Sequence, residues 1–163
     1  MTWRITAYNL HGYILLLTQE KFSSRLEIVI YLAPSLILLY AAIDIMAWLN
    51  RDKKHAAVQR CDFLCWVDTY LLPISKQSYT AKDLYGARCS VIHSYSAESK
   101  LSREGKAAKL NYSLGPEEKE NLQKDIDFTK ELNTKAIDLK VLFTDTKKAI
   151  NQFLDDEGNN KLV

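Results

Sequence analysis

The sequence predicts an all-α protein, a bundle of about five to six helices. Apolar residues recur at helical spacing in several segments, and only 5 Gly and 3 Pro are present for the tight turns of an all-β fold. Apolar residues make up 47% of the chain and charged residues 26%, which is the profile of a globular protein. With 163 residues, we expect a single domain over residues 1–155 and a frayed tail at 156–163.

The first half of the chain contains three helical patterns. Amphipathic spacing predicts a helix over residues 7–20. Residues 26–50 are apolar on nearly all sides, so we expect this helix at the centre of the bundle, with a start or a kink at Pro34. A third helix, over residues 57–72, should end at Pro73.

The second half begins with a T-x-x-D capping pair. The Thr80 hydroxyl can accept from the first free amides of a helix, and Asp83 complements the helix dipole. Alternation in KLNYSL predicts a short extended segment near 107–114. Pro116, followed by acidic residues, is a typical helix start. An apolar stripe predicts a final helix over residues 139–154.

Charge and cysteine content narrow the class of protein. The net charge of +2 excludes the global cationic field of a strong nucleic-acid binder, so any basic site must be local. Three cysteines form no secreted scaffold, and no signal-peptide pattern is visible, which favours the cytoplasm. The apolar run at 28–43 is shorter than the roughly 20 residues of a spanning helix. We therefore expect no membrane association, and a membrane span is the less favoured alternative.

The helix that begins at Thr80 carries an arginine where apolar residues are expected. Its core stripe is formed by Leu84, Ala87, Val91 and Tyr95. Arg88 lies at the edge of that stripe, and His93 follows about 140° further round the helix. Between them lies a second, largely uncharged face of Tyr85, Cys89 and Ile92. We expect a second copy of the chain to cover this face, which would bring two arginines and two histidines together.

Arginine and histidine so placed suit RNA cleavage. A guanidinium binds phosphate and keeps its charge, and an imidazole exchanges protons near neutral pH. Because RNA carries its own nucleophile, the 2′-hydroxyl, Arg88 and His93 would need no metal. The alternative is structural, since an arginine at a stripe edge commonly pairs with an acid on a neighbouring helix.

Asp44 interrupts the apolar segment AAIDIMAWL. An unpaired carboxylate buried there would be very costly, so we expect Asp44 to contact Arg88. The contact could hold Arg88 in its working orientation, or it could simply fix how two helices pack.

Two further groups are weaker candidates. In the run KLSREGKAAK, Lys100, Arg103 and Lys106 could guide a phosphate backbone, although a solvated loop is an equal alternative. Cys61 and Cys65 could place two sulfurs on one helix face. The third cysteine and the three histidines supply no matching zinc spacing, so we expect core cysteines, no metal site and no cofactor.

The block LYGARCSVIHSYSAES, with an acidic residue in the preceding apolar helix, resembles the HEPN superfamily and some small uncharacterised bacterial HEPN-like proteins. The resemblance covers about residues 25–100. It implies a HEPN-like helical bundle and a metal-independent endoribonuclease with Arg88 and His93 as the catalytic pair. Asp44, Cys89 and Tyr85 would support them. It also implies a homodimer with a shared active site, acting on RNA as a toxin or a defence component, and a cognate antitoxin or partner protein. The alternative function is a non-catalytic helical dimer that binds RNA, nucleotide or a partner protein.

Overall fold

The computed structural model describes residues 23–94 and 99–160, and within them the side chains of 32–92 and 99–157. In this part of the chain, six α-helices pack with one small sheet of two parallel strands. The prediction of a mainly helical fold is confirmed, but the fold is not purely α. The helix predicted at 7–20 lies outside the described residues.

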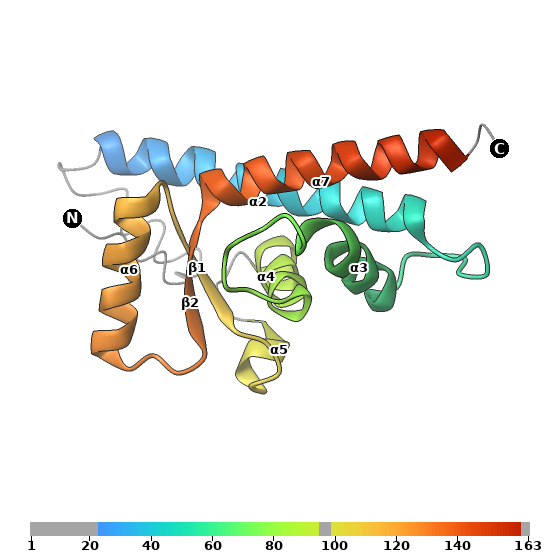
Figure 1. Ribbon diagram of the computed structural model, residues 1–163. Coiled ribbons are helices and arrows are strands. Elements are labelled where there is room, and N and C mark those ends of the chain that lie inside the picture. Colours follow the sequence, from blue (N-terminus) through green and yellow to red (C-terminus); the bar gives the residue numbers. More distant parts are fainter. Residues whose placement is uncertain (1–22, 95–98, 161–163) are drawn as a thin grey trace.

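Two long helices lie across one side of the molecule (Figure 1). They are α2 (Ser23–Asn50) and α7 (Leu139–Asn160), and their midparts pack against each other. Helix α2 runs through Pro34 without ending. Helix α7 continues to Asn160, so residues 156–160 of the expected tail are helical.

Helix α2 is buried on one side only. Leu36, Tyr40, Ile43 and Ala47 lie in the core, whereas Leu38 is 69% exposed and Ile45 is 55% exposed. Trp48 and Leu49 are also exposed. The expected place at the centre of the bundle is therefore wrong, because α3, α4 and α7 cover only the inner side of this helix.

Helices α3 and α4 pack below the two long helices (Figure 1). Helix α3 (Arg60–Trp66) continues into a π-helical turn, η1 (Val67–Leu71), and together they replace the helix predicted at 57–72. Helix α4 (Ala81–Ser94) begins as predicted. The Thr80 amide donates to Asp83 Oδ2 at 2.9 Å, and the Asp83 amide donates to Thr80 Oγ1 at 3.2 Å. The capping pair is confirmed.

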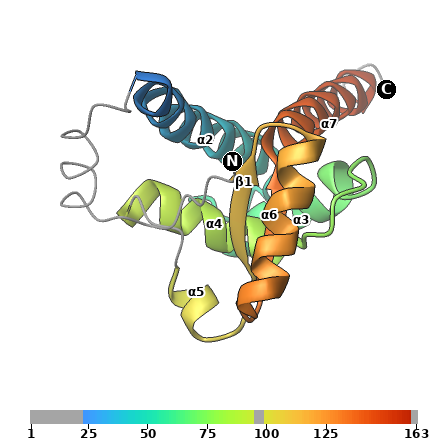
Figure 2. The same ribbon diagram turned by 90° about the vertical axis from the view of Figure 1, so that its left-hand side faces the viewer.

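The sheet is a β–α–β unit. Strand β1 (Lys109–Ser113) lies within the predicted extended segment, and α6 (Pro116–Thr129) starts at the predicted proline. Strand β2 (Thr134–Asp138), which was not predicted, pairs parallel with β1. Helix α6 supplies the crossover that parallel strands require. It lies against one face of the sheet (Figure 2). On this face, Leu122, Ile126 and Ala136 form a small buried cluster.

The first turn of α4 is attached to both strands through one carboxylate. Asp83 is 4% exposed. Its Oδ1 accepts from the Ala108 amide at 2.6 Å, just before β1, and its Oδ2 accepts from Lys135 Nζ of β2 at 2.9 Å. Asp83 therefore acts as more than a helix cap, since it fixes α4 relative to the sheet.

One helix of the described residues is long and apolar enough to cross a membrane. It is the 19-residue part Leu32–Asn50 of α2, with a mean hydropathy of 1.9. Core helices of soluble proteins meet the same criterion, although only 33% of this window is buried here. The expected absence of membrane association stays a prediction.

Candidate active site

Arg88 of α4 contacts Asp44 of α2 directly. The Nε and Nη2 atoms of Arg88 lie 2.9 and 2.8 Å from Oδ2 of Asp44. Each side chain is 21% exposed, so the pair lies at the edge of the core with access to solvent. The predicted contact between an acid in the apolar helix and the arginine of α4 is confirmed.

The surroundings of Arg88 favour its charged form. Burial alone disfavours a charge, but the hydrogen bonds and negative charge of Asp44, together with Cys89, outweigh it and raise the pKa of Arg88 above its ordinary value. A guanidinium in this setting keeps its charge at all accessible pH values. Its orientation is set by Asp44, because a planar guanidinium fits a carboxylate in few geometries.

A second arginine, Arg60 at the start of α3, contacts the same aromatic ring as Arg88. The two guanidinium carbons lie 5.3 Å (Arg60) and 6.0 Å (Arg88) from the centre of the Tyr85 ring. Phe63 of α3 packs edge-on against the same ring, with centroids 5.4 Å apart. Two cations and an aromatic ring are thus gathered at one place, which suits a phosphate next to a base.

Tyr85 stays uncharged in this cluster. Burial is the main cause that raises the pKa of Tyr85, and the neighbouring Cys89 adds to it. The positive charges of Arg88 and Arg60 act in the opposite direction but are weaker. The phenol is therefore a hydrogen-bond donor near neutral pH.

The face between Arg88 and His93 is not left entirely for a second copy. Tyr85, Cys89 and Ile92 are each half-buried, and Tyr85 and Ile92 pack against the core of their own chain. The expectation of a face that one chain cannot use is wrong, because α3 reaches it through Phe63.

His93 lies in the last turn of α4, and its side chain is outside the described residues. On a regular helix it is about 7.5 Å along the axis from Arg88. Tyr95, expected in the core stripe, also lies outside the described residues. The rest of the stripe is confirmed, since Leu84 and Ala87 are buried and Val91 packs against the core.

The predicted basic segment packs directly on α4. It forms the short helix α5 (Lys100–Arg103), whose cap Ser99 is buried. A Cβ atom at Gly86 would lie 3.2 Å from Ala107 Cβ and 3.3 Å from Ser99 Oγ, so glycine permits this close approach.

Two lysines of this segment, Lys100 and Lys106, are already paired. Lys106 Nζ lies 2.8 Å and Lys100 Nζ 3.9 Å from Glu104 carboxylate oxygens. The hydrogen bond from Lys106 lowers the pKa of Glu104. Burial opposes this effect, and the charges of Lys106, Lys100 and Arg103 add to it. Arg103 is exposed. All three predicted RNA-binding residues therefore lie near Glu104, and Arg103 is the one without a salt bridge among the described contacts.

No family model, curated protein or solved structure matches the chain.

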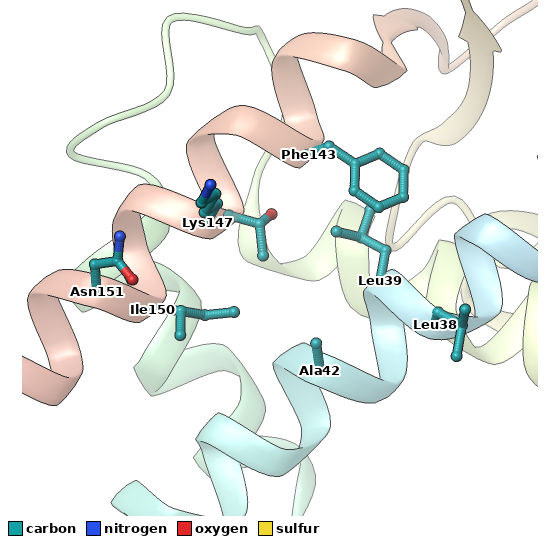
Figure 3. Close-up of a pocket in the computed structure, with 8 residues that line it drawn as sticks. Leu38, Leu39, Ala42, Phe143, Lys147, Ile150 and Asn151 are labelled. Carbon is teal, nitrogen blue, oxygen red and sulfur yellow. The ribbon is translucent and has the colours of Figure 1, made fainter.

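A groove lies between α2 and α7 (Figure 3). It has a volume of about 200 Å³. Its walls are mostly apolar, with Thr146, Lys147 and Asn151 as polar groups among Leu38, Leu39, Ala42, Phe143 and Ile150. Figure 3 shows the Phe143 ring of α7 beside Leu39 of α2. Such a groove can receive an apolar side chain, but it does not hold the paired acid and base that chemistry needs.

Cys61 and Cys65 are both exposed, so the expectation of core cysteines is wrong. They lie one turn apart on α3, whose other side buries Phe63 and Trp66. Trp48 of α2 is also exposed, at 47%. Its ring lies under the guanidinium of Arg51, at 4.3 Å.

Proposed function

We propose that this protein is a metal-independent endoribonuclease of the HEPN type that acts as a homodimer. The observation that supports it is the position of Arg88. This half-buried arginine lies on the same helix as His93, and Asp44 of α2 holds it in place. Arg60 and Tyr85 extend the site with a second cation and a stacking surface. The substrate is RNA in the cytoplasm, and regulation by a partner protein, such as an antitoxin, fits an enzyme of this class.

The reaction needs only groups of the protein and of the RNA. His93 takes the proton of a 2′-hydroxyl, and the 2′-oxygen forms a bond to the adjacent phosphorus. The bond from phosphorus to the 5′-oxygen breaks, and that oxygen takes the proton that His93 carries after the first step. Arg88 stabilises the negative charge that develops on the phosphate oxygens. The products end in a 2′,3′-cyclic phosphate and a 5′-hydroxyl.

The exposed apolar stripe of α2 supports a homodimer. Ile45 follows Asp44 directly, and Trp48 lies one helical turn after Asp44. These exposed side chains border the Asp44–Arg88 pair, so a second copy seated on them would also close the arginine site. Self-association through this stripe would place the two α2 helices, each with its Asp44, next to the two-fold axis.

The decisive experiment is RNA cleavage by pure protein in EDTA. Arg88→Ala and His93→Ala should each lower the rate at least about 100-fold. Lys82→Ala is the matched control, because Lys82 is an exposed cation on the same helix. Products of the wild type should carry cyclic phosphate ends. Full activity in both site variants would exclude this mechanism.

A mixing experiment tests the shared site. Arg88→Ala and His93→Ala subunits, exchanged into a mixed dimer, retain one intact arginine and one intact histidine between them. Part of the activity should return on mixing, although each variant alone is inactive. Failure of the mixed dimer to cleave would place a complete site within a single chain.

The second candidate is a non-catalytic dimer that binds RNA, nucleotide or a partner protein in the same place. It is favoured by Cys89, since active members of the family often carry Asn, Asp or His directly after the arginine. RNA binding without any cleaved product in the EDTA assay would select this candidate.

A further inference from the structure

The structure places a histidine beside Cys61 and Asp62 of α3. His55 belongs to the connection between α2 and α3, and its Nδ1 lies 3.0 Å from Oδ1 and 3.2 Å from Oδ2 of Asp62. Ligand atoms of His55, Cys61 and Asp62 all lie within 4.8 Å of one another. The spacing in the sequence did not reveal this group, because the turn after Asn50 folds His55 back onto α3.

The two segments are held in place by other contacts. Arg51 Nε donates to the His55 carbonyl at 3.1 Å and fixes the turn that presents the imidazole. Oδ2 of Asp62 accepts from the Gln59 amide at 2.7 Å, so the carboxylate is oriented while its Oδ1 faces His55. The geometry therefore exists before any ligand arrives, which reduces the entropic cost of binding.

We propose that His55, Cys61 and Asp62 bind a divalent transition-metal ion of the zinc class. Imidazole nitrogen, thiolate sulfur and carboxylate oxygen are the three ligand types of zinc sites, whereas Mg²⁺ and Ca²⁺ prefer oxygen alone. Small rotations of three side chains already within 4.8 Å of one another bring them to coordination distance. Water occupies the fourth position of the tetrahedron.

Binding exchanges protons for the metal. The Cys61 thiol loses its proton to solvent, and a proton on Nδ1 of His55 moves through solvent to Nε2, which leaves the Nδ1 lone pair for the metal. Cys61 is exposed, so the ion can enter directly. The bound ion would clamp the turn after α2 to the start of α3, next to Arg60. This proposal does not depend on the proposed ribonuclease activity.

The test is a titration of the metal-free, reduced full-length protein with Co²⁺, which reports its ligands by colour. We expect one equivalent to bind with a sulfur-to-cobalt charge-transfer band and to be displaced by Zn²⁺. Cys61→Ser should remove the band, and His55→Ala should weaken binding at least about tenfold. Cys65→Ser, which removes an exposed cysteine one turn away, should keep the band.

Zn²⁺ should also raise the melting temperature of the wild type and of Cys65→Ser, but not that of Cys61→Ser. A wild-type protein without the charge-transfer band, or a band that survives in Cys61→Ser, would overturn the proposal. The same holds if Cys65→Ser loses the band, since the sulfur ligand would then be the other cysteine. Each serine variant replaces one sulfur atom by oxygen. A folding defect would appear as a lowered melting temperature of the metal-free variant.

Discussion

Asp44 and Arg88 are 44 positions apart in the chain, and one carboxylate oxygen of Asp44 accepts from two nitrogens of Arg88. Asp44→Asn keeps the shape of the side chain but removes its charge, which leaves the guanidinium poorly oriented. We expect the free energy of unfolding to fall by about 1–2 kcal/mol, between the values of exposed and buried pairs. RNA cleavage should fall about 10- to 100-fold.

Denaturant unfolding and single-turnover cleavage measure these two effects separately. Asp68→Asn, which changes an exposed acid on η1, is the control and should change stability by less than about 0.5 kcal/mol. Lowered stability with unchanged cleavage would mean that the pair only fixes the packing of α2 on α4.

Arg60 should contribute to RNA affinity rather than to the chemical step. Its guanidinium lies over Tyr85 and it is exposed, so it can reach a phosphate beside the scissile one. Arg60→Ala should weaken RNA binding and lower the slope of log affinity against log salt by about one. Fluorescence anisotropy at several salt concentrations measures that slope. An unchanged slope would show that Arg60 makes no phosphate contact.

The exposed stripe of α2 should mediate dimerisation. Ile45→Glu places a charge in the proposed interface, so a monomer is expected in size-exclusion chromatography with light scattering. Leu132→Glu is a strict control, because Leu132 is 92% exposed and lies far along the chain, just before β2. A dimer that survives Ile45→Glu would place the contact between the two copies elsewhere.

Asp83 should make stability depend on pH. Burial raises the pKa of Asp83, but Lys135 and the amides of Ala108 and Thr80 outweigh it, so the pKa in the folded state is lowered. A lowered pKa stabilises the fold above the unfolded value of about 3.9, and that stabilisation is lost as pH falls through the folded value.

The corresponding experiment compares the wild type with Asp83→Asn. The variant should lose about 1–3 kcal/mol of stability at neutral pH, since it breaks a charged hydrogen-bond network. The difference should shrink below about pH 4. Asp155→Asn, at an exposed position of α7, should show little difference at any pH. A gap between wild type and Asp83→Asn that persists unchanged in acid would contradict the role of the charge.

Local patterns in the sequence predicted the start of α4 and the contact of Arg88 with Asp44. A capping pair is a short-range signal, and a carboxylate in an apolar segment needs a partner wherever the chain goes. Strand β2 was missed because nothing marks the end of α6: Lys130 takes the left-handed conformation, with φ of 51°, where glycine is usual.

Other features depend on which elements meet. The cysteines were predicted in the core, and the helix over residues 26–50 at its centre, because apolar periodicity shows that a face is apolar without showing whether another helix covers it. Arg60 and His55 were missed for the same reason, since their neighbours come from other elements of the fold. Sequence patterns alone did not reveal these tertiary contacts.

The salt bridge from Asp83 to Lys135 spans 52 positions. Translation proceeds from the N-terminus, so the ribosome completes α4 well before the strand that anchors it. A shortened chain that stops before Lys135 would still contain the arginine and the histidine, but its α4 would lack its attachment to β2. The contact that anchors α4 to the sheet is therefore synthesised after the residues of the arginine centre.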